Sequence, residues 1–123
     1  MPAPIVFFDI AGPDLQKQKA FYEGVFGWTV SEEGHLNTPV AAPLPGILRV
    51  EAEAGFQPER LLYLGVDDIT ATLDQIVANG GGVVFPRMAV PGVVILALFT
   101  DPAGNRMGLV ELADGKPIVP PVQ

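Results

Sequence analysis

Three polar side chains, Asp9, Tyr63 and Arg106, stand in stretches of sequence that read as strands and are otherwise largely apolar. Because side chains alternate between the two faces of a strand, the spacing puts them on one face with three neighbours that lack polar side-chain atoms: Phe7, Leu61 and Gly108. A carboxylate enclosed by apolar groups is favoured in its protonated form and can act as a general acid or base. Asp9 is therefore the weak candidate for catalysis; alternatively, Asp9 and Arg106 pair with each other or lie in water at a rim.

The same face is the predicted ligand-binding site, made of Phe7, Asp9, Leu61, Tyr63, Arg106 and Gly108. Aromatic rings there can stack on a planar ligand, and the Tyr63 hydroxyl can meet water or a ligand atom. A glycine at position 108 leaves room for a ligand atom or for a bulky side chain opposite it. The residue types predict a cavity that is lined mainly by apolar side chains and has few polar groups.

The stretch "TDPAGNRMGLVE" ends in Glu111 and raises the question of a metal site. Glu111 has the wrong parity to share a face with Gly108, so we expect it to point away and to be solvated at the strand end. The single histidine, His35, lies in the polar stretch "SEEGHLN", a predicted turn where a solvated side chain is expected. A site built only from Asp9, Glu51 or Glu53 would suit a hard ion alone.

There is no cysteine. A divalent cation needs nitrogen, oxygen or sulfur donors, and the side chains of Phe7, Leu61 and Gly108 offer none. The sequence also lacks a Ser-His-Asp set, a glycine-rich phosphate loop and a zinc signature. We therefore predict no metal ion and no other cofactor.

Composition excludes several function classes. The net charge is −7 and the seven Lys and Arg residues are spread thinly, which argues against nucleic-acid binding. No apolar run approaches the roughly 20 residues of a membrane helix, and the start "MPAPIVFFDI" lacks a basic region, so a cytoplasmic protein is expected. Hydrophobic residues make up 49% and the mean hydropathy is +0.36, which favours apolar surface facing a small-molecule ligand or a second subunit. We expect a homodimer.

A weak internal repeat organises the chain at an offset of 54 residues. Phe7 falls on Leu61 and Asp14 on Asp68, and the order of strand, acidic helix start, helix and glycine turn is the same in both halves. The second helix carries one apolar stripe through Ile69, Leu73 and Ile76. The repeat predicts one domain, residues 1–123, with a first module over about 4–54, a second over about 58–111 and a Pro-rich tail over 112–123.

Each module is predicted to open with a strand, at 5–10 and 61–66, and to continue after its helix with further strands: 28–32, 46–51, 82–85, 93–99 and 106–111. The Pro-rich piece 37–46 reads as a loop or a poor edge strand, and "VPGV" as a type II turn. The tail cannot extend a helix or a central strand, so it is loose or laid over a neighbour. The predicted class is α+β, a curved and mostly antiparallel sheet forming a cup with helices on its outside.

The stretches "FFDIAGPDLQKQKAFYEGVFGW", "YLGVDDITATLDQIVANGGGVVFPRMAVPG" and "DPAGNRMGLVE" resemble the vicinal oxygen chelate superfamily of glyoxalase I, bleomycin-resistance proteins and extradiol dioxygenases. The resemblance covers roughly residues 4 to 111. It implies paired βαβββ modules that form a cup, which in the enzymes holds a divalent metal between His and Glu side chains from four strands. In this sequence it places the metal-ligand positions at Phe7, Leu61 and Gly108, and a fourth near 49–53 whose register is open.

Glyoxalase-type isomerisation and extradiol cleavage both need a metal, so these residues argue against both reactions. The resemblance then implies a metal-free protein that holds an apolar or aromatic compound, as bleomycin-resistance proteins sequester drugs. Two alternatives remain open: a lyase, isomerase or dioxygenase-type enzyme with Asp9 as base or with relocated metal ligands, and a module whose cup is filled by its own side chains. The sequence identifies neither the ligand nor whether the modules close within one chain or across a dimer.

Overall fold

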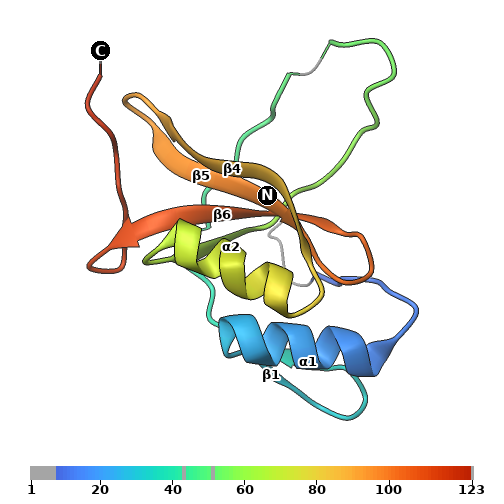
Figure 1. Ribbon diagram of the computed structural model, residues 1–123. Helices are drawn as coiled ribbons and strands as arrows, with labels where there is room; N and C mark the ends of the chain where they lie inside the picture. Colours follow the sequence, from blue (N-terminus) through green and yellow to red (C-terminus); the bar gives the residue numbers. More distant parts are fainter. Residues whose placement is uncertain (1–7, 43, 51, 123) are drawn as a thin grey trace, which may run out of the picture.

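The computed structural model describes residues 8–42, 44–50 and 52–122 (Figure 1). The described elements follow in this order: α1 (Leu15–Phe26), β1 (Thr29–Val30), β2 (Leu36–Asn37), β3 (Tyr63–Val66), α2 (Ile69–Ala78), β4 (Gly82–Val90), β5 (Val94–Thr100), β6 (Arg106–Ala113) and β7 (Lys116–Pro117). The predicted α+β class with a mostly antiparallel sheet is confirmed, and the sheet is open rather than closed.

Both helices begin at the aspartates that the repeat placed in register. The Asp14 carboxylate accepts a hydrogen bond from the Lys17 amide at 3.1 Å, and the Asp68 carboxylate accepts one from the Ala71 amide at 2.9 Å. Each bond satisfies an amide of the first turn that has no partner within the helix. α1 ends at Gly27, whose φ of 70° is a left-handed conformation that glycine adopts without strain.

The main sheet has the strand order β3-β6-β5-β4, with β3 parallel to β6 and the other pairs antiparallel. Both helices lie on one side of this sheet (Figure 1). Burial alternates strictly along β5, so Ile95, Ala97 and Phe99 face the helices while the residues between them face the other way.

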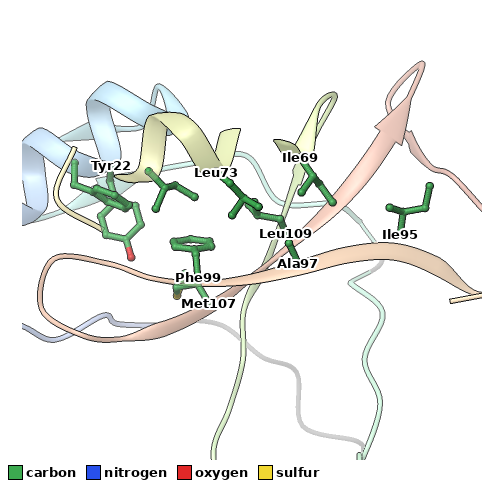
Figure 2. Close-up of a cluster of buried hydrophobic side chains, with 10 residues drawn as sticks. Tyr22, Ile69, Leu73, Ile95, Ala97, Phe99, Met107 and Leu109 are labelled. Carbon is green, nitrogen blue, oxygen red and sulfur yellow. The ribbon is translucent and has the colours of Figure 1, made fainter. Parts of the chain in front are cut away.

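The hydrophobic core fills the space between the helices and this face of the sheet (Figure 2). Ile69 and Ile76 of α2 and Phe99 of β5 have no exposed surface, and the Tyr22 ring of α1 stacks on Trp28 at 4.9 Å between centroids. Burying side chains of this size stabilises the fold by about 1.5–3 kcal/mol each. The core therefore fixes one face of the sheet and leaves the other face to the candidate site.

The first half of the chain departs from the predicted strands. Residues 8–10 and 44–50 are irregular, and Ile47 and Leu48 are 88% and 97% exposed, so the prediction of a strand over 46–51 is wrong for its described part. The predicted strand 28–32 is reduced to β1, which pairs with β2 in a separate hairpin. Prolines at 39, 43 and 45 remove backbone donors that a strand there would need. In Figure 1 the described residues between β2 and β3 arch away on the side of the sheet opposite the helices.

The strands β4 and β6 in the second half of the chain are longer than predicted. β4 and β5 join through Pro91 and Gly92, where Gly92 has φ of 74° and Val93 donates to the Val90 carbonyl at 3.0 Å, as the predicted turn requires. β6 continues to Ala113, so part of the tail does extend a central strand, contrary to the prediction.

The rest of the tail is laid over its neighbours. β7 pairs with β6, and the Pro120 carbonyl accepts from the Gly92 amide at 2.8 Å. Within the described ranges, neither helix is long and apolar enough to cross a membrane.

Candidate functional site

The face of the sheet opposite the helices carries the candidate site. The strand register gives this open face the following residues: Tyr63 on β3, Phe85 and Met88 on β4, Leu96 and Leu98 on β5, and Arg106, Gly108 and Val110 on β6. Tyr63, Phe85 and Met88 are 46%, 40% and 39% exposed. Tyr63 lies on β3 and the other two on β4, the two outer strands of the main sheet, so large exposed apolar side chains flank this face on both sides. Such side chains on one sheet face form a surface suited to binding rather than to solvation.

On the open face, the ring of Tyr63, from the outer strand β3, lies over Gly108 of β6. The two residues are partners in the β3–β6 register. A Cβ atom on Gly108 would stand 2.9 Å from Tyr63 Cγ and nearer still to two other ring carbons. The ring therefore occupies the space that any side chain at position 108 would need, and it presents a flat aromatic surface on the floor of the site.

A charged cluster borders this ring. The Arg106 Nε lies 3.6 Å from the Glu59 Oε1, and the Arg49 Nη2 lies 2.8 Å from the Glu59 Oε2. The Arg49 guanidinium also stands 5.7 Å from the centre of the Phe56 ring. Glu59 thus links the irregular segment before β3 to the start of β6, and sequence reasoning missed both Glu59 and Phe56 because no strand or helix pattern marks their segment.

The structure places the other predicted site residues outside its strands or does not describe them. Leu61 is half-buried just before β3, and Phe7 lies outside the described residues. Asp9 is exposed in an irregular segment, and Arg106 meets Glu59 rather than Asp9, so the predicted alternative of an Asp9–Arg106 pair is not what the structure has. Of the predicted set, Tyr63, Arg106 and Gly108 come together on neighbouring strands.

Glu111 points away from the open face as expected, but the prediction that it is solvated is wrong. It is 7% exposed and accepts a hydrogen bond from the Ile69 amide at the start of α2, at 3.0 Å. Arg87 binds its carboxylate through two nitrogens, at 2.6 Å from Nη2 and 3.0 Å from Nε. The hydrogen bonds from Arg87, followed by the one from the Ile69 amide, lower the pKa of Glu111 against the opposing effect of burial. Glu111 therefore anchors α2 to the sheet and is not a site residue.

A second buried carboxylate holds the turn that leads into Arg106. Asp101 is 2% exposed and accepts hydrogen bonds from the Tyr22 hydroxyl at 2.8 Å and the Asn105 amide at 2.9 Å. Burial, and then the negative charge of Asp101, raise the pKa of the Tyr22 hydroxyl, which stays protonated as the donor. The pair fixes α1 to the β5–β6 turn and so sets the position at which β6 begins.

The residues of the open face do not fit the divalent metal that the fold family implies. Leu61 and Gly108 offer no donor atom, and the Tyr63 ring fills the space beside Gly108. In the described part of the chain, no three His, Cys, Asp or Glu side chains gather as a metal site would require. His35 is exposed in the β1–β2 turn, in agreement with its prediction as a turn residue.

A surface hollow on the helix side has a volume of about 400 Å³ and is lined by Lys17, Ala20, Phe21, Asn79, Gly80 and Pro102. It shares no residue with the open face, and a single lysine is its charged group. A shallow depression of this kind offers neither an aromatic floor nor converging polar groups, so we assign the site to the open face.

Comparisons with known proteins agree with this architecture. Residues 5–109 match the profile of the family described as Glyoxalase/Bleomycin resistance protein/Dioxygenase superfamily. The anthracycline biosynthesis protein DnrV of Streptomyces peucetius is 29% identical over 142 residues, covering 92% of this chain and 50% of that protein. The putative glyoxylase CFP32 of Mycobacterium tuberculosis is 28% identical over 116 residues, covering 82% and 42%. This chain thus spans about half the length of the curated relatives it matches.

Solved structures share the fold at low identity. The hypothetical protein SA1046 of S. aureus has a TM-score of 0.63 at 16% identity, over 91% of this chain and 96% of its own. A glyoxalase/bleomycin resistance protein/dioxygenase family enzyme of Burkholderia phytofirmans has a TM-score of 0.60 at 17% identity, over 81% and 91%. TnmS3, an antibiotic binding protein from Streptomyces sp. CB03234, has a TM-score of 0.50 at 23% identity, over 86% and 93%.

Proposed function

We propose that this chain, which belongs to the Glyoxalase/Bleomycin resistance protein/Dioxygenase superfamily, binds an apolar or aromatic small molecule on its open face without a metal ion. The observation that carries the proposal is the Tyr63 ring lying over Gly108. It puts a hydrocarbon surface at a position where, by the family resemblance, a metal-binding carboxylate would stand. A flat ring with aliphatic neighbours favours a planar ligand through stacking and apolar burial.

The names of two similar proteins support a small-molecule role. TnmS3 is an antibiotic binding protein, and DnrV is an anthracycline biosynthesis protein. Neither name identifies the ligand of this chain, but both are compatible with an aromatic compound held on the same scaffold.

We also propose a cytoplasmic homodimer. The exposed aliphatic residues Ile47, Leu48 and Val50 in the segment before β3 leave an apolar surface on a single copy that a second copy would cover. Sedimentation velocity at micromolar concentration should give a single species of twice the chain mass; a pure monomer would contradict this part of the proposal.

The binding proposal is tested by titrating 2-naphthamide, a neutral planar probe, into protein treated with a chelator and checked for metal by elemental analysis. We expect saturable heat of binding that the chelator leaves unchanged. Tyr63→Ala should weaken binding about tenfold, because the stacking surface is lost. Val77→Ala, which shortens an exposed apolar side chain on α2, is the matched control and should bind as the parent does. Binding that appears only after a divalent metal is added would overturn the proposal.

An enzyme is the second candidate, because one relative is named a putative glyoxylase. Its base would be Asp9, which is exposed and lies just before α1. If a substrate is found, Asp9→Asn should abolish turnover; unchanged turnover would remove Asp9 from this role.

A further inference from the structure

Arg106 is the only charged side chain that the register places on the open face, among the described residues of β3 to β6. The other strand arginine, Arg87, is bound to Glu111 and serves the helix side. The direct partner of Arg106 in the β5–β6 register is Thr100, and Leu98 and Tyr63 follow as its diagonal neighbours on the open face. A cation at the edge of a largely apolar surface is a selective group, because it can distinguish ligands by charge.

The guanidinium of Arg106 keeps unused hydrogen-bonding capacity. Its nearest acidic partner in the described ranges is Glu59, whose Oε1 lies 3.6 Å from the Nε, too far for a hydrogen bond. Glu59 is held more tightly by Arg49, at 2.8 Å through its other oxygen. An arginine has five N–H donors in a planar fork that matches a carboxylate, so an incoming anion could pair with Arg106 through two bonds while Glu59 stays with Arg49.

The spacing of the cation and the aromatic floor defines the shape of the ligand. Tyr63 pairs with Gly108, which is two residues along β6 from Arg106. One strand spacing and two residues correspond to about 8 Å between the Cα atoms of Tyr63 and Arg106. The side chain of Arg106 is 44% exposed, so its head can reach a group above the face. A rigid aromatic compound that stacks on Tyr63 would bring a substituent at its edge to Arg106.

We infer that the open face selects planar aromatic compounds that carry an anionic oxygen group, with the rings on Tyr63 and the anion on Arg106 in place of its loose contact with Glu59. The inference rests on the proposed function and names the chemical class of its ligand. A net charge of −7 repels anions at long range, so a preference for an acid must come from a local cation, and Arg106 is the cation that the register places on this face.

The test compares two matched probes, 2-naphthoate and 2-naphthamide, which share the rings and differ in charge. We expect the parent protein to bind the acid about tenfold more tightly, a difference of about 1.4 kcal/mol. Arg106→Gln should remove this preference by weakening naphthoate about tenfold and leaving naphthamide unchanged. Arg60→Gln makes the same charge change at an exposed residue outside the site and should leave both affinities as they were.

Glu59→Gln should change the affinity for naphthoate in the opposite direction to Arg106→Gln. Removing the negative charge beside Arg106 should strengthen naphthoate binding about threefold and leave naphthamide unchanged, a gain that misfolding cannot produce. Equal affinity for the two probes in the parent protein, or a preference for the amide, would overturn the inference and leave the proposed function standing. Binding of neither probe would overturn both. A preference for the acid that survives Arg106→Gln would also overturn the assignment to this residue.

Discussion

The contact between Tyr63 and Gly108 leads to a quantitative prediction for Gly108→Ala. The added methyl group would stand within 2.9 Å of Tyr63 Cγ and closer to other ring carbons. Because the contact includes the root of the ring and not only its tip, the whole side chain must move. Overpacking of this kind costs about 1–3 kcal/mol. Alanine gains roughly 0.5–1 kcal/mol over glycine from the smaller entropy of the unfolded chain. We therefore expect the free energy of unfolding to fall by up to about 2.5 kcal/mol.

The double variant isolates the clash. In a Tyr63→Ala background the three ring atoms nearest to the methyl group are gone, so Gly108→Ala should be neutral or should stabilise by up to about 1 kcal/mol. The difference between the two backgrounds, about 1–3 kcal/mol, is the coupling energy of the pair. Equilibrium urea denaturation of the four proteins, followed by far-UV circular dichroism, measures it. Additive effects within about 0.5 kcal/mol would refute the placement of the ring over Gly108.

Three further variants test the framework that holds the open face, each by urea denaturation. Glu111→Gln should lose roughly 2 kcal/mol at neutral pH because Arg87 loses its charged partner. Since the fold lowers the pKa of Glu111 below its ordinary 4.5, this stabilisation is present above that value and disappears as the pH falls through the lower folded value; a loss that stays constant down to pH 3 would contradict the assignment. Asp101→Asn should lose about 2 kcal/mol, because an amide cannot accept all the hydrogen bonds that converge on that carboxylate; an unchanged midpoint would rule this out. Phe99→Ala should lose about 3–5 kcal/mol from the core, and a loss under about 1 kcal/mol would show that Phe99 is not enclosed.

The helices and the second-half strands were predictable because local signals fix them. Asp14 and Asp68 are helix caps that the sequence shows directly, and the apolar stripe of α2 indicates its buried face without tertiary information. β5, by contrast, is apolar at every position before Thr100, so its sequence predicts a strand but does not show which side faces the helices.

The strands of the first half of the chain were less predictable, because the apolar pattern there conflicts with the prolines that precede it. The apolar run around Ile47 reads as a strand, but the prolines before it weaken hydrogen bonding, and no described strand of the main sheet takes it as a neighbour. Whether such a run joins a sheet depends on tertiary partners, which periodicity does not report.

The candidate site was half predictable. Strand parity placed Tyr63, Arg106 and Gly108 on one face, and the structure brings them onto adjacent strands. Parity also turned Glu111 away from that face. Strand parity could not reveal that Arg87 and Ile69 contact Glu111, or that Glu59 lies beside Arg106. Each of these contacts joins segments that are far apart in the chain. Contacts between distant segments depend on register and loop path rather than on local pattern.

The most direct test of the account is a map of backbone amide shifts in the metal-stripped protein as 2-naphthoate is added. We expect the largest shifts to fall on β3, β5 and β6 around Tyr63, Leu98 and Gly108. These shifts should saturate, and added zinc or manganese should not change them. Shifts confined to the helix side, or shifts on the open face that require a metal, would contradict the claim that this surface binds its ligand through an aromatic floor without an ion.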